Sequence, residues 1–375
     1  MDWTSGPPER PPGTGTGAGS PRPGSVGQLR RSHPLVRETG KAWRRLTSVP
    51  DGLKPAAHEP PGRTLIACSG GADSSALAAA LTLVAGPHAL VMGHVVHDLR
   101  PRADALADRD AAAALAERLG IAFVQREVRV GPGNAEAGAR RQRYAALAEM
   151  ARASRCGAVA TAHHAGDQLE SLLMALMRGA GLDGMRGIAA RRRLTDGVWL
   201  VRPMLGVRPE LTRRACTLAG IAWREDATNA DVSRLRAALR ARVVPEMLAL
   251  RPGAAERAAD TARLMAHAAA LVREQVRRLR REPPVWSRDE LRKASPIVLG
   301  ALIRDEATDR GRHGRDRLSA RIIGAIVRAV RDGSTDPRRF ELAGGGLVIV
   351  TAREVRIERA PERPAPGPVQ EPPSV

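Results

Sequence analysis

The stretch TLIACSGGADSS, residues 64–75, decides the fold. It opens with an apolar run suited to a buried strand, passes through a turn of Ser and Gly, and leads into an Ala- and Leu-rich segment typical of a helix. Adjacent glycines let the backbone approach an oxyanion, and a helix that begins beside them presents free N–H groups and a partial positive charge. The stretch therefore predicts a phosphate-binding loop at the carboxyl end of a strand, where ligands bind in a parallel α/β sheet.

One residue of this loop needs an explanation of its own. The loop residues expected to bind phosphates are Ser69, Gly70, Gly71, Ala72, Asp73 and Ser74. A carboxylate such as Asp73 repels phosphate unless a divalent cation lies between them, and Mg²⁺ held through the phosphates resolves that repulsion. An ordinary strand–helix turn, capped by Ser and Gly, would explain only part of the segment.

Strand-like and helix-like segments alternate on both sides of the loop. We expect strands at residues 64–68, 90–97, 122–130, 158–162 and 198–202, and helices at 75–84, 103–119, 136–156, 168–178 and 210–219. This alternation is typical of an α/β protein with a doubly wound, mainly parallel, Rossmann-like sheet. A helical segment at 254–281, helices near 296–307 and 320–332, and a β-meander within 339–359 predict a small α+β C-terminal domain.

Composition suggests four parts along the chain. Residues 1–30 are dense in Pro, Gly, Ser and Thr, which predicts a disordered leader, and 361–375 reads as a disordered tail. Between them we place a catalytic domain at 31–250 and an RNA-binding C-terminal region at 251–360. The boundary follows a shift in composition near Pro245 and Pro252, after which the pattern is wholly helical.

Charge and cysteine content narrow the partners. The 375 residues carry a formal net charge of +20, and nearly all the cations are Arg, since Lys occurs only at positions 41, 54 and 293. The guanidinium group of Arg matches the geometry of phosphate, so a nucleic-acid partner is favoured. A GC-rich genome, whose codons favour Arg over Lys, is an alternative explanation of the high Arg content. The three cysteines form no Cys-x-x-Cys pair and no long apolar run occurs, which argues against zinc, an iron–sulfur cluster or a membrane span and favours the cytoplasm.

A second motif, residues 161–170, combines histidines with acids. His163 ends a predicted strand, while Asp167 and Glu170 lie three positions apart at the start of the next helix, so both acids share one face. These groups could coordinate Mg²⁺, bind an ammonium group or take its proton. Acidic capping of a helix N-terminus is the simpler alternative.

Several segments together resemble one known family. The strand–SGGADSS–helix unit is similar to pyrophosphatase-loop (PP-loop) ATP enzymes, which cleave ATP between its α and β phosphates. Within this superfamily, the chain resembles the tRNA(Ile)-lysidine synthetase family. The resemblance extends in consistent order over residues 95–100, 139–144, 161–170, 177–182, 201–205 and 225–231. The chain departs from the family at Gly166, where an Asp is usual, and at Ala237, where an Asn is usual.

The resemblance implies a specific reaction. ATP would adenylate C2 of the wobble cytidine, position 34, in an isoleucine tRNA with a CAU anticodon, and free L-lysine would then displace AMP to give lysidine. Decoding would change from AUG to AUA. The resemblance assigns ATP binding to the loop, phosphate-bound Mg²⁺ to Asp73, and catalysis or lysine binding to Asp73, His163, Asp167 and Glu170.

Seven arginines and one asparagine are the candidate RNA contacts, with a solvated helix face as the alternative for the arginines. The candidates are Arg140, Arg143, Arg178, Arg202, Arg208, Asn229, Arg236 and Arg240. Two rival functions stay open: a tRNA thiolase of the same superfamily, which should show catalytic or cluster-binding cysteines, and an RNA-binding protein without catalysis. The sequence also leaves open whether the chain forms a homodimer.

Overall fold

The computed structural model describes residues 26–48, 62–98, 101–129, 135–224, 235–310, 319–342 and 346–359. Most of the expected leader and tail lies outside these residues. The chain divides into two compact units, Met1–Arg263 and Leu264–Val375, which we call unit 1 and unit 2 and describe separately. The division falls within helix α9 (Ala254–Leu279).

Unit 1 is built on a six-stranded sheet with the order β3-β2-β1-β4-β6-β5. Its strands are β1 (Arg63–Ala67), β2 (Leu90–His97), β3 (Ala122–Val128), β4 (Cys156–Ala160), β5 (Arg191–Thr195) and β6 (Val198–Val201). All neighbouring pairs are parallel except β5 and β6, which are antiparallel. This confirms the prediction of a doubly wound, mainly parallel sheet.

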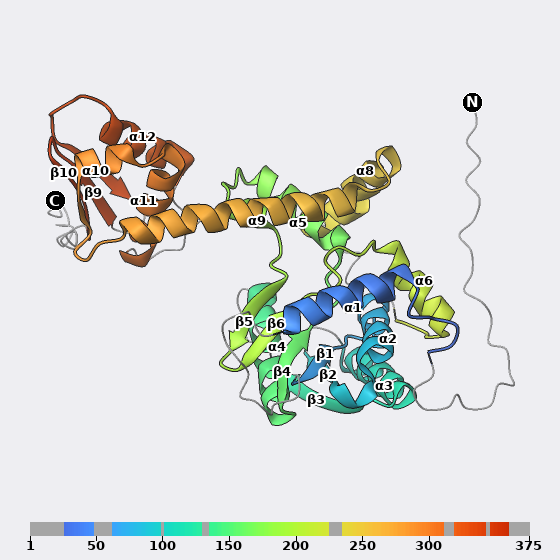
Figure 1. Cartoon of the computed structure of the whole chain (residues 1–375). Coiled ribbons are helices and arrows are strands. Elements are labelled where there is room, and N and C mark those ends of the chain that lie inside the picture. The colour runs from blue at the N-terminus through green and yellow to red at the C-terminus, as the bar shows by residue number, and fades with distance from the viewer. Residues whose placement is uncertain are drawn as a thin grey trace, which may run out of the picture. The chain divides into compact units, whose positions relative to one another are not determined.

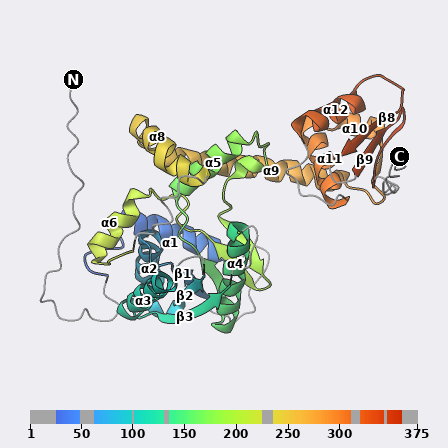
Figure 2. The ribbon, with the colours of Figure 1, turned by 180° about the vertical axis from the view of Figure 1, so that it is seen from behind.

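Helices cover both faces of this sheet, as Figures 1 and 2 show from opposite sides. The flanking helices are α1 (Pro34–Thr47), α2 (Ala72–Ala85), α3 (Arg102–Leu119), α4 (Ala135–Ala153) and α6 (Glu210–Ala219). Successive strand residues point to opposite faces, so in β1 Leu65 packs with the residues of α4 while Ile66 packs with those of α1, α2 and α3. Burial on both sides explains why the central strands are almost continuously apolar.

Several elements of unit 1 have no counterpart among the expectations from sequence, including the helical segment 235–250, an edge strand and the first helix. The edge strand β5 reads Arg-Arg-Arg-Leu-Thr, which lacks the apolar alternation typical of a strand. Helix α1 follows the expected leader directly and begins at Pro34, a favoured first helical residue. The chain is already packed before it, because Leu29 is fully buried and the N–H of Gln28 donates to the carbonyl of Leu218 at 2.7 Å.

A separate apolar cluster joins α5 (Ala165–Met177), α8 (Val244–Leu250) and the first part of α9. Helix α7 (Leu235–Ala238) and the π-helical turn η4 (Leu239–Val243) lead into α8. The π turn has a cause in the sequence: Pro245 cannot donate to the carbonyl four residues earlier and its ring crowds that carbonyl, so the preceding turn widens. Val244 packs there with Leu169, Leu172 and Ala262, which joins α8 to α5 and α9.

Unit 2 is a four-stranded antiparallel sheet packed with helices. Its elements after α9 are β7 (Val285–Ser287), α10 (Arg288–Lys293), α11 (Pro296–Arg310), α12 (Ala320–Arg331), β8 (Arg338–Leu342), β9 (Gly346–Val350) and β10 (Glu354–Arg359), with the strand order β7-β10-β9-β8. The α+β prediction is confirmed, and β7 adds a strand to the expected meander. Trp286 fills the core and donates to the carbonyl of Leu279 at 2.6 Å.

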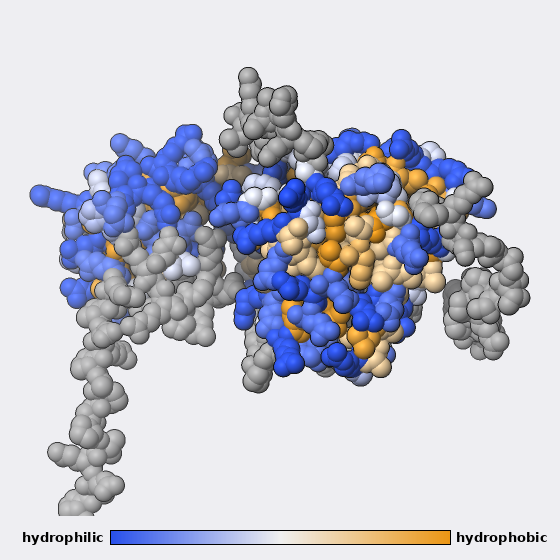
Figure 3. Space-filling model, turned by 90° about the horizontal axis from the view of Figure 1, so that it is seen from below, coloured by the Kyte–Doolittle hydropathy of each residue, from blue (hydrophilic) through white to orange (hydrophobic). Residues whose placement is uncertain are grey.

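The outer surface of unit 2 is largely hydrophilic on the face seen in Figure 3, whereas the visible face of unit 1 also carries apolar areas. In the part of the chain that the structure describes, no helix combines the length and apolar character needed to cross a bilayer.

Candidate active site

The phosphate-loop candidate lies where the strand order reverses. β1 pairs with β2 on one side and with β4 on the other, so the carboxyl ends of β1 and β4 flank a topological switch point. The loop follows β1, and Gly71 caps α2 without a side-chain hydrogen bond, leaving the first N–H groups of the helix available. Gly70 has φ +84°, and an added Cβ would lie 3.2 Å from the carbonyl oxygen of Asp108, so the loop needs glycine here.

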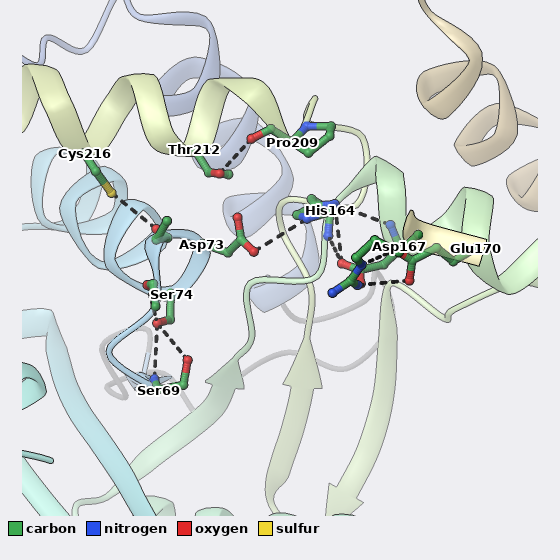
Figure 4. Close-up of polar contacts among 12 residues, drawn as sticks. Ser69, Asp73, Ser74, His164, Asp167, Glu170, Pro209, Thr212 and Cys216 are labelled. Carbon is green, nitrogen blue, oxygen red and sulfur yellow. Dashed lines mark hydrogen bonds and ion pairs between the residues drawn. The ribbon is translucent and has the colours of Figure 1, made fainter. Parts of the chain in front are cut away.

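The loop is shaped by the buried hydroxyl of Ser74. It donates to the carbonyl of Gly71 at 3.0 Å and accepts from the N–H of Ser69 at 3.2 Å, with the Ser69 hydroxyl 3.3 Å away (Figure 4). Outside the loop, the N–H of Arg224 donates to the carbonyl of Gly70 at 3.1 Å. These bonds fix the loop before any ligand arrives, so its N–H groups are preorganised.

Asp73 faces away from the loop core toward α5 (Figure 4). Its carboxylate lies 3.6 Å from Nε2 of His164, and its side chain is 47% exposed. Burial opposes ionisation, but contacts with His164 outweigh it and lower the pKa of Asp73 below its ordinary value. The carboxylate is therefore ionised and accessible, which suits a contact with a cation.

His164 links the loop to the second motif. As the N-cap of α5 its Nδ1 accepts from the N–H of Asp167 at 3.4 Å, and the N–H of His164 donates to that carboxylate at 2.9 Å, which forms a reciprocal capping box. Burial lowers the pKa of His164, but the carboxylates of Asp73 and Asp167 reverse this and raise it above 6.5. The neutral ring accepts this capping bond at Nδ1, whereas the imidazolium, protonated on both nitrogens, acts on Asp73 and Asp167 through its charge.

His163 points elsewhere. Its Nδ1 lies 3.0 Å from the hydroxyl of Thr161, and burial together with nearby arginines lowers its pKa to about 3. The imidazole is therefore neutral at physiological pH, and such a low pKa makes it a weak general base.

The two acids of α5 are held by two arginines. Arg236 bridges them, with its Nε 2.7 Å from Glu170 and its Nη2 2.8 Å from Asp167. Arg240 donates to both carboxylate oxygens of Glu170, from Nε at 2.6 Å and from Nη2 at 3.0 Å. We call these four residues the acid–arginine cluster. Glu170 is 3% exposed, and Arg236 and Arg240 are 36% and 44% exposed, so the arginines lie on the solvent side. Burial opposes ionisation of Asp167, but His164 and the other nearby positive groups lower its pKa.

Other arginines gather around the sole tyrosine. Guanidinium groups of Arg140, Arg143 and Arg192 lie 5.2, 5.5 and 4.8 Å from the ring centre of Tyr144. Arg202 is buried beneath them, donates to the Tyr144 hydroxyl at 3.4 Å, and its Nε has no hydrogen-bond partner in the described part of the chain. We call these five residues the tyrosine cluster. Among the described residues, no carboxylate forms an ion pair with its arginines.

The remaining candidates are scattered. Arg178 is exposed at the end of α5, Arg208 forms an ion pair with Glu256, and Asn229 lies outside the described residues. Sequence reasoning missed Arg192, whose strand was not expected, and Gln168, whose amide clamps both backbone groups of Ile188 at 2.9 and 2.7 Å. The isolated Tyr144 beside two arginines was a signal that could have pointed to the tyrosine cluster.

The family departure at Gly166 also has a structural context. A Cβ at this position would lie 2.9 Å from Cε1 of the His164 ring and 3.6 Å from Pro209. Any larger residue here would therefore have to displace the capping imidazole. The contact between His164 and Asp73 thus depends on glycine in this conformation.

Metal-binding geometry is absent where the structure can be described. In these ranges, no three residues of the types His, Cys, Asp or Glu gather in a way that could hold a metal ion. Cys68, Cys156 and Cys216 are all buried free thiols.

Comparisons with known proteins identify a family. The family model of the PP-loop domain matches residues 46–247. The tRNA(Ile)-lysidine synthase of Salinispora tropica is 40% identical over 277 residues, covering 71% of this chain and 82% of the relative. The protein of that name from Nostoc sp. is 35% identical over 240 residues, covering 63% and 70%. A solved structure of the U34-tRNA thiolase NcsA from Methanococcus maripaludis, with its 4Fe–4S cluster, shares 17% sequence identity with this chain. The match covers 62% of this chain and 79% of the thiolase, with a TM-score of 0.47.

A glycine-rich anion loop at the switch point of a parallel sheet, together with the matching family model, defines a PP-loop nucleotide-binding protein. Identity with the curated relatives extends beyond this domain over most of their length. The chain belongs to the tRNA(Ile)-lysidine synthase family.

Proposed function

We propose that this protein joins free lysine to C2 of the wobble cytidine in an isoleucine tRNA with a CAU anticodon, using ATP. The observation that carries the proposal is one continuous path of side chains: Asp73 beside the phosphate loop contacts His164, which caps the helix that bears Asp167 and Glu170. This path supports an ATP site that adjoins an ammonium-binding acid pair, as a two-step adenylation and amine transfer requires.

The first step uses the loop. Attack of the cytosine C2 oxygen on the α-phosphate forms an O–P bond and releases pyrophosphate, whose negative charge the N–H groups at the start of α2 can stabilise. The internal bonds of Ser74 hold these groups in place, so little reorganisation is needed during the reaction. AMP on the oxygen then makes a good leaving group for the second step.

The residues around Asp73 fit a phosphate-bound Mg²⁺. The carboxylate is ionised and nearly half exposed, and Asp73 lies in the first turn of α2, whose N–H groups would bind the phosphates. Mg²⁺ at such a place neutralises charge on the phosphates and keeps several waters. Asp73 would hold it, and the loop residues Ser69 to Ser74 would bind the phosphates.

The second step belongs to α5. Asp167 and Glu170 would bind the ε-ammonium group of lysine, and one of them would accept a proton so that the free amine can attack C2 and expel AMP. His163 contacts the hydroxyl of Thr161, so we assign it a positioning role there. The attacking amine loses its proton as the C–N bond forms, and AMP leaves with the C2 oxygen.

RNA would be held by arginines that lack carboxylate partners. Arg140, Arg143 and Arg178 are exposed and form no ion pair within the described ranges, which suits them to backbone phosphates. Arg202, Arg208, Arg236 and Arg240 would contribute from more constrained positions. The Arg-rich composition supports the same partner.

The function is tested by incubating the protein with labelled lysine, ATP and an isoleucine tRNA transcript with a CAU anticodon, then scoring covalent label on the RNA. In the Asp73→Asn variant, which keeps the shape of the side chain, we expect pyrophosphate release to fall by about 100-fold or more because the carboxylate that would hold phosphate-bound Mg²⁺ is removed. A Thr217→Ala variant, altered at a surface position of α6, is the control and should keep its rate. No labelled RNA from folded protein would refute the proposal.

A thiolase function has no support in the described residues. Burial raises the pKa of Cys156 to about 11 and of Cys216 to about 12, which keeps both as unreactive thiols. The nucleotide requirement separates ligation from RNA binding without catalysis, since only the enzyme releases pyrophosphate when cognate RNA is added.

A further inference from the structure

The acid–arginine cluster fills the place that lysine is proposed to take. The two carboxylates are matched by two guanidinium groups at 2.6–3.0 Å, so the cluster carries no net charge. An ammonium group is attracted to a site with unbalanced negative charge. With both arginines in place that imbalance is missing.

The exposed fractions of these side chains show that the arginines lie between the solvent and Glu170. The Glu170 side chain is almost inaccessible, whereas Arg240 in front of it is 44% exposed. A cation that arrives from solvent therefore meets a guanidinium group before it meets the carboxylate. Lysine can bind Glu170 only if at least one arginine withdraws, because the carboxylate oxygens already accept charge-assisted hydrogen bonds.

The arginine side chains can withdraw without unfolding their helix. Both lie on the short segment α7–η4, and the next residue after it, Val244, anchors that segment in the apolar cluster with α5 and α9. The backbone is thus held, while the two long side chains are more than a third exposed and have rotatable stems. A change of rotamer is enough to uncover the acids.

A phosphate group is the natural acceptor for a departing guanidinium. Planar, bidentate recognition of carboxylate and phosphate uses the same donor geometry, so Arg can exchange one for the other at little cost in hydrogen bonds. Two substrates of the proposed reaction carry phosphates, namely RNA and ATP. Hydrogen bonds with Glu170 and charge–charge attraction from Glu170, Asp167 and Asp73 raise the pKa of Arg240, so its guanidinium group interacts with the acids of both motifs.

We propose that Arg236 and Arg240 are internal cations that occupy the lysine site until a phosphate group of RNA or ATP draws Arg240 away. The inference rests on the proposed function, because it takes Asp167 and Glu170 as the ammonium site. Lysine then binds after the phosphate-bearing substrate. Since coupling between two ligands is reciprocal, lysine must tighten the binding of that substrate by the same factor.

The wild-type protein provides the first test. Binding of labelled lysine is measured by equilibrium dialysis to the full chain alone, with α,β-methylene ATP, which cannot be cleaved at that bond, and with the tRNA transcript. We expect affinity for lysine to rise at least about 10-fold with one of the two phosphate ligands, which identifies the source of the phosphate. Equal affinity in all three conditions overturns the proposal.

A variant separates occupation of the lysine site by the protein's own arginines, which we call self-occupation, from other causes of weak lysine binding. Arg240→Gln removes the charge but keeps a polar side chain of similar length, and we expect it to bind lysine without RNA or ATP at least about 10-fold more tightly than the wild type. Arg242→Gln is the matched control, since Arg242 lies exposed in the same π-helical turn and makes the same change of charge. Unchanged lysine binding in Arg240→Gln, with a wild-type melting curve, contradicts the inference.

The two proposals fail in different ways. If wild-type protein transfers lysine to RNA while its lysine affinity does not depend on phosphate ligands, the function stands and self-occupation is wrong. If no lysine is transferred, the function itself is refuted. The reciprocal measurement, RNA affinity with and without lysine, checks the coupling even if the variant does not fold.

Discussion

The acid–arginine cluster and the tyrosine cluster are built from the same cationic residue but face opposite kinds of neighbour. Arg236 and Arg240 are neutralised by buried carboxylates at short distances. Arg140, Arg143 and Arg192 stack on Tyr144, and in the described residues they have no carboxylate partner. In the sequence, all of these arginines except Arg192 belong to one undifferentiated set of RNA-binding candidates.

The difference teaches that charge alone does not make an arginine available to RNA. A guanidinium group bound to two carboxylates must first give up those contacts, so part of its attraction to phosphate is lost. A guanidinium group on an aromatic face keeps its N–H donors directed outward and keeps its full charge. The tyrosine cluster is therefore the better candidate for permanent RNA contact, and the acid–arginine cluster for a conditional one.

The largest effect should follow from breaking the acid–arginine cluster at its buried acid. Glu170→Ala leaves two guanidinium groups without their shared partner and removes the proposed ammonium ligand, so we expect lysine transfer to fall by about 100-fold or more. Some pyrophosphate release should persist, because the phosphate loop is untouched. The partly exposed arginines can turn to solvent, so the free energy of unfolding should fall by only about 1–2 kcal/mol.

Rates of label transfer and of pyrophosphate release, with urea unfolding, check this prediction. Glu256→Ala is the matched control, since it removes a carboxylate from an ion pair with the exposed Arg208 outside the site. Transfer in Glu170→Ala that equals the control would remove Glu170 from the lysine site.

A smaller effect should come from the tyrosine cluster. Arg143→Gln removes an unpaired charge, and we expect RNA affinity to fall about 3- to 10-fold and the salt dependence of binding to lose about one phosphate contact. Arg208→Gln should change affinity less, since Arg208 is already paired with Glu256. Titrations at several salt concentrations measure both. An equal loss in the two variants would show that pairing does not govern RNA contact.

Much of the catalytic fold could be predicted because its signals are local. Strand β2 spans the expected residues 90–97, and α6 spans 210–219, since burial on both faces or a regular apolar period marks such elements clearly. The edge strand β5 could not be predicted, because three consecutive arginines hide its pairing with β6. Edge strands need few apolar residues, and charged ones protect the edge.

In the candidate site, too, only the features that a local sequence pattern marks could be predicted. The phosphate loop lies within one strand–turn–helix segment, so its residues could be named from sequence alone. The pairing of Asp167 with Arg236 joins positions 69 residues apart through a helix whose geometry depends on the π turn before Pro245. Sequence identified both residues but assigned them to different ligands, because no local pattern shows that two opposite charges meet.

The smallest effect should separate His164 from the arginines as the partner of Asp167. Because the folded protein raises the pKa of His164 above its unfolded value of 6.5, its stabilising charge is fully present below that pH and is lost as pH rises through the folded pKa. His164→Asn keeps a good N-cap but cannot titrate. We therefore expect the melting temperature of the wild type to fall more than that of the variant between pH 6 and about 8.5.

Asp73 and Asp167, whose pKa values are lowered, stay ionised throughout this range and do not contribute to the difference. Thermal unfolding at matched ionic strength measures the effect. If both proteins show the same pH dependence, Asp167 is held by Arg236 and the backbone rather than by a charged His164. The capping imidazole would then act only as a hydrogen-bond acceptor, and the link between the phosphate loop and the acid–arginine cluster would be steric rather than electrostatic.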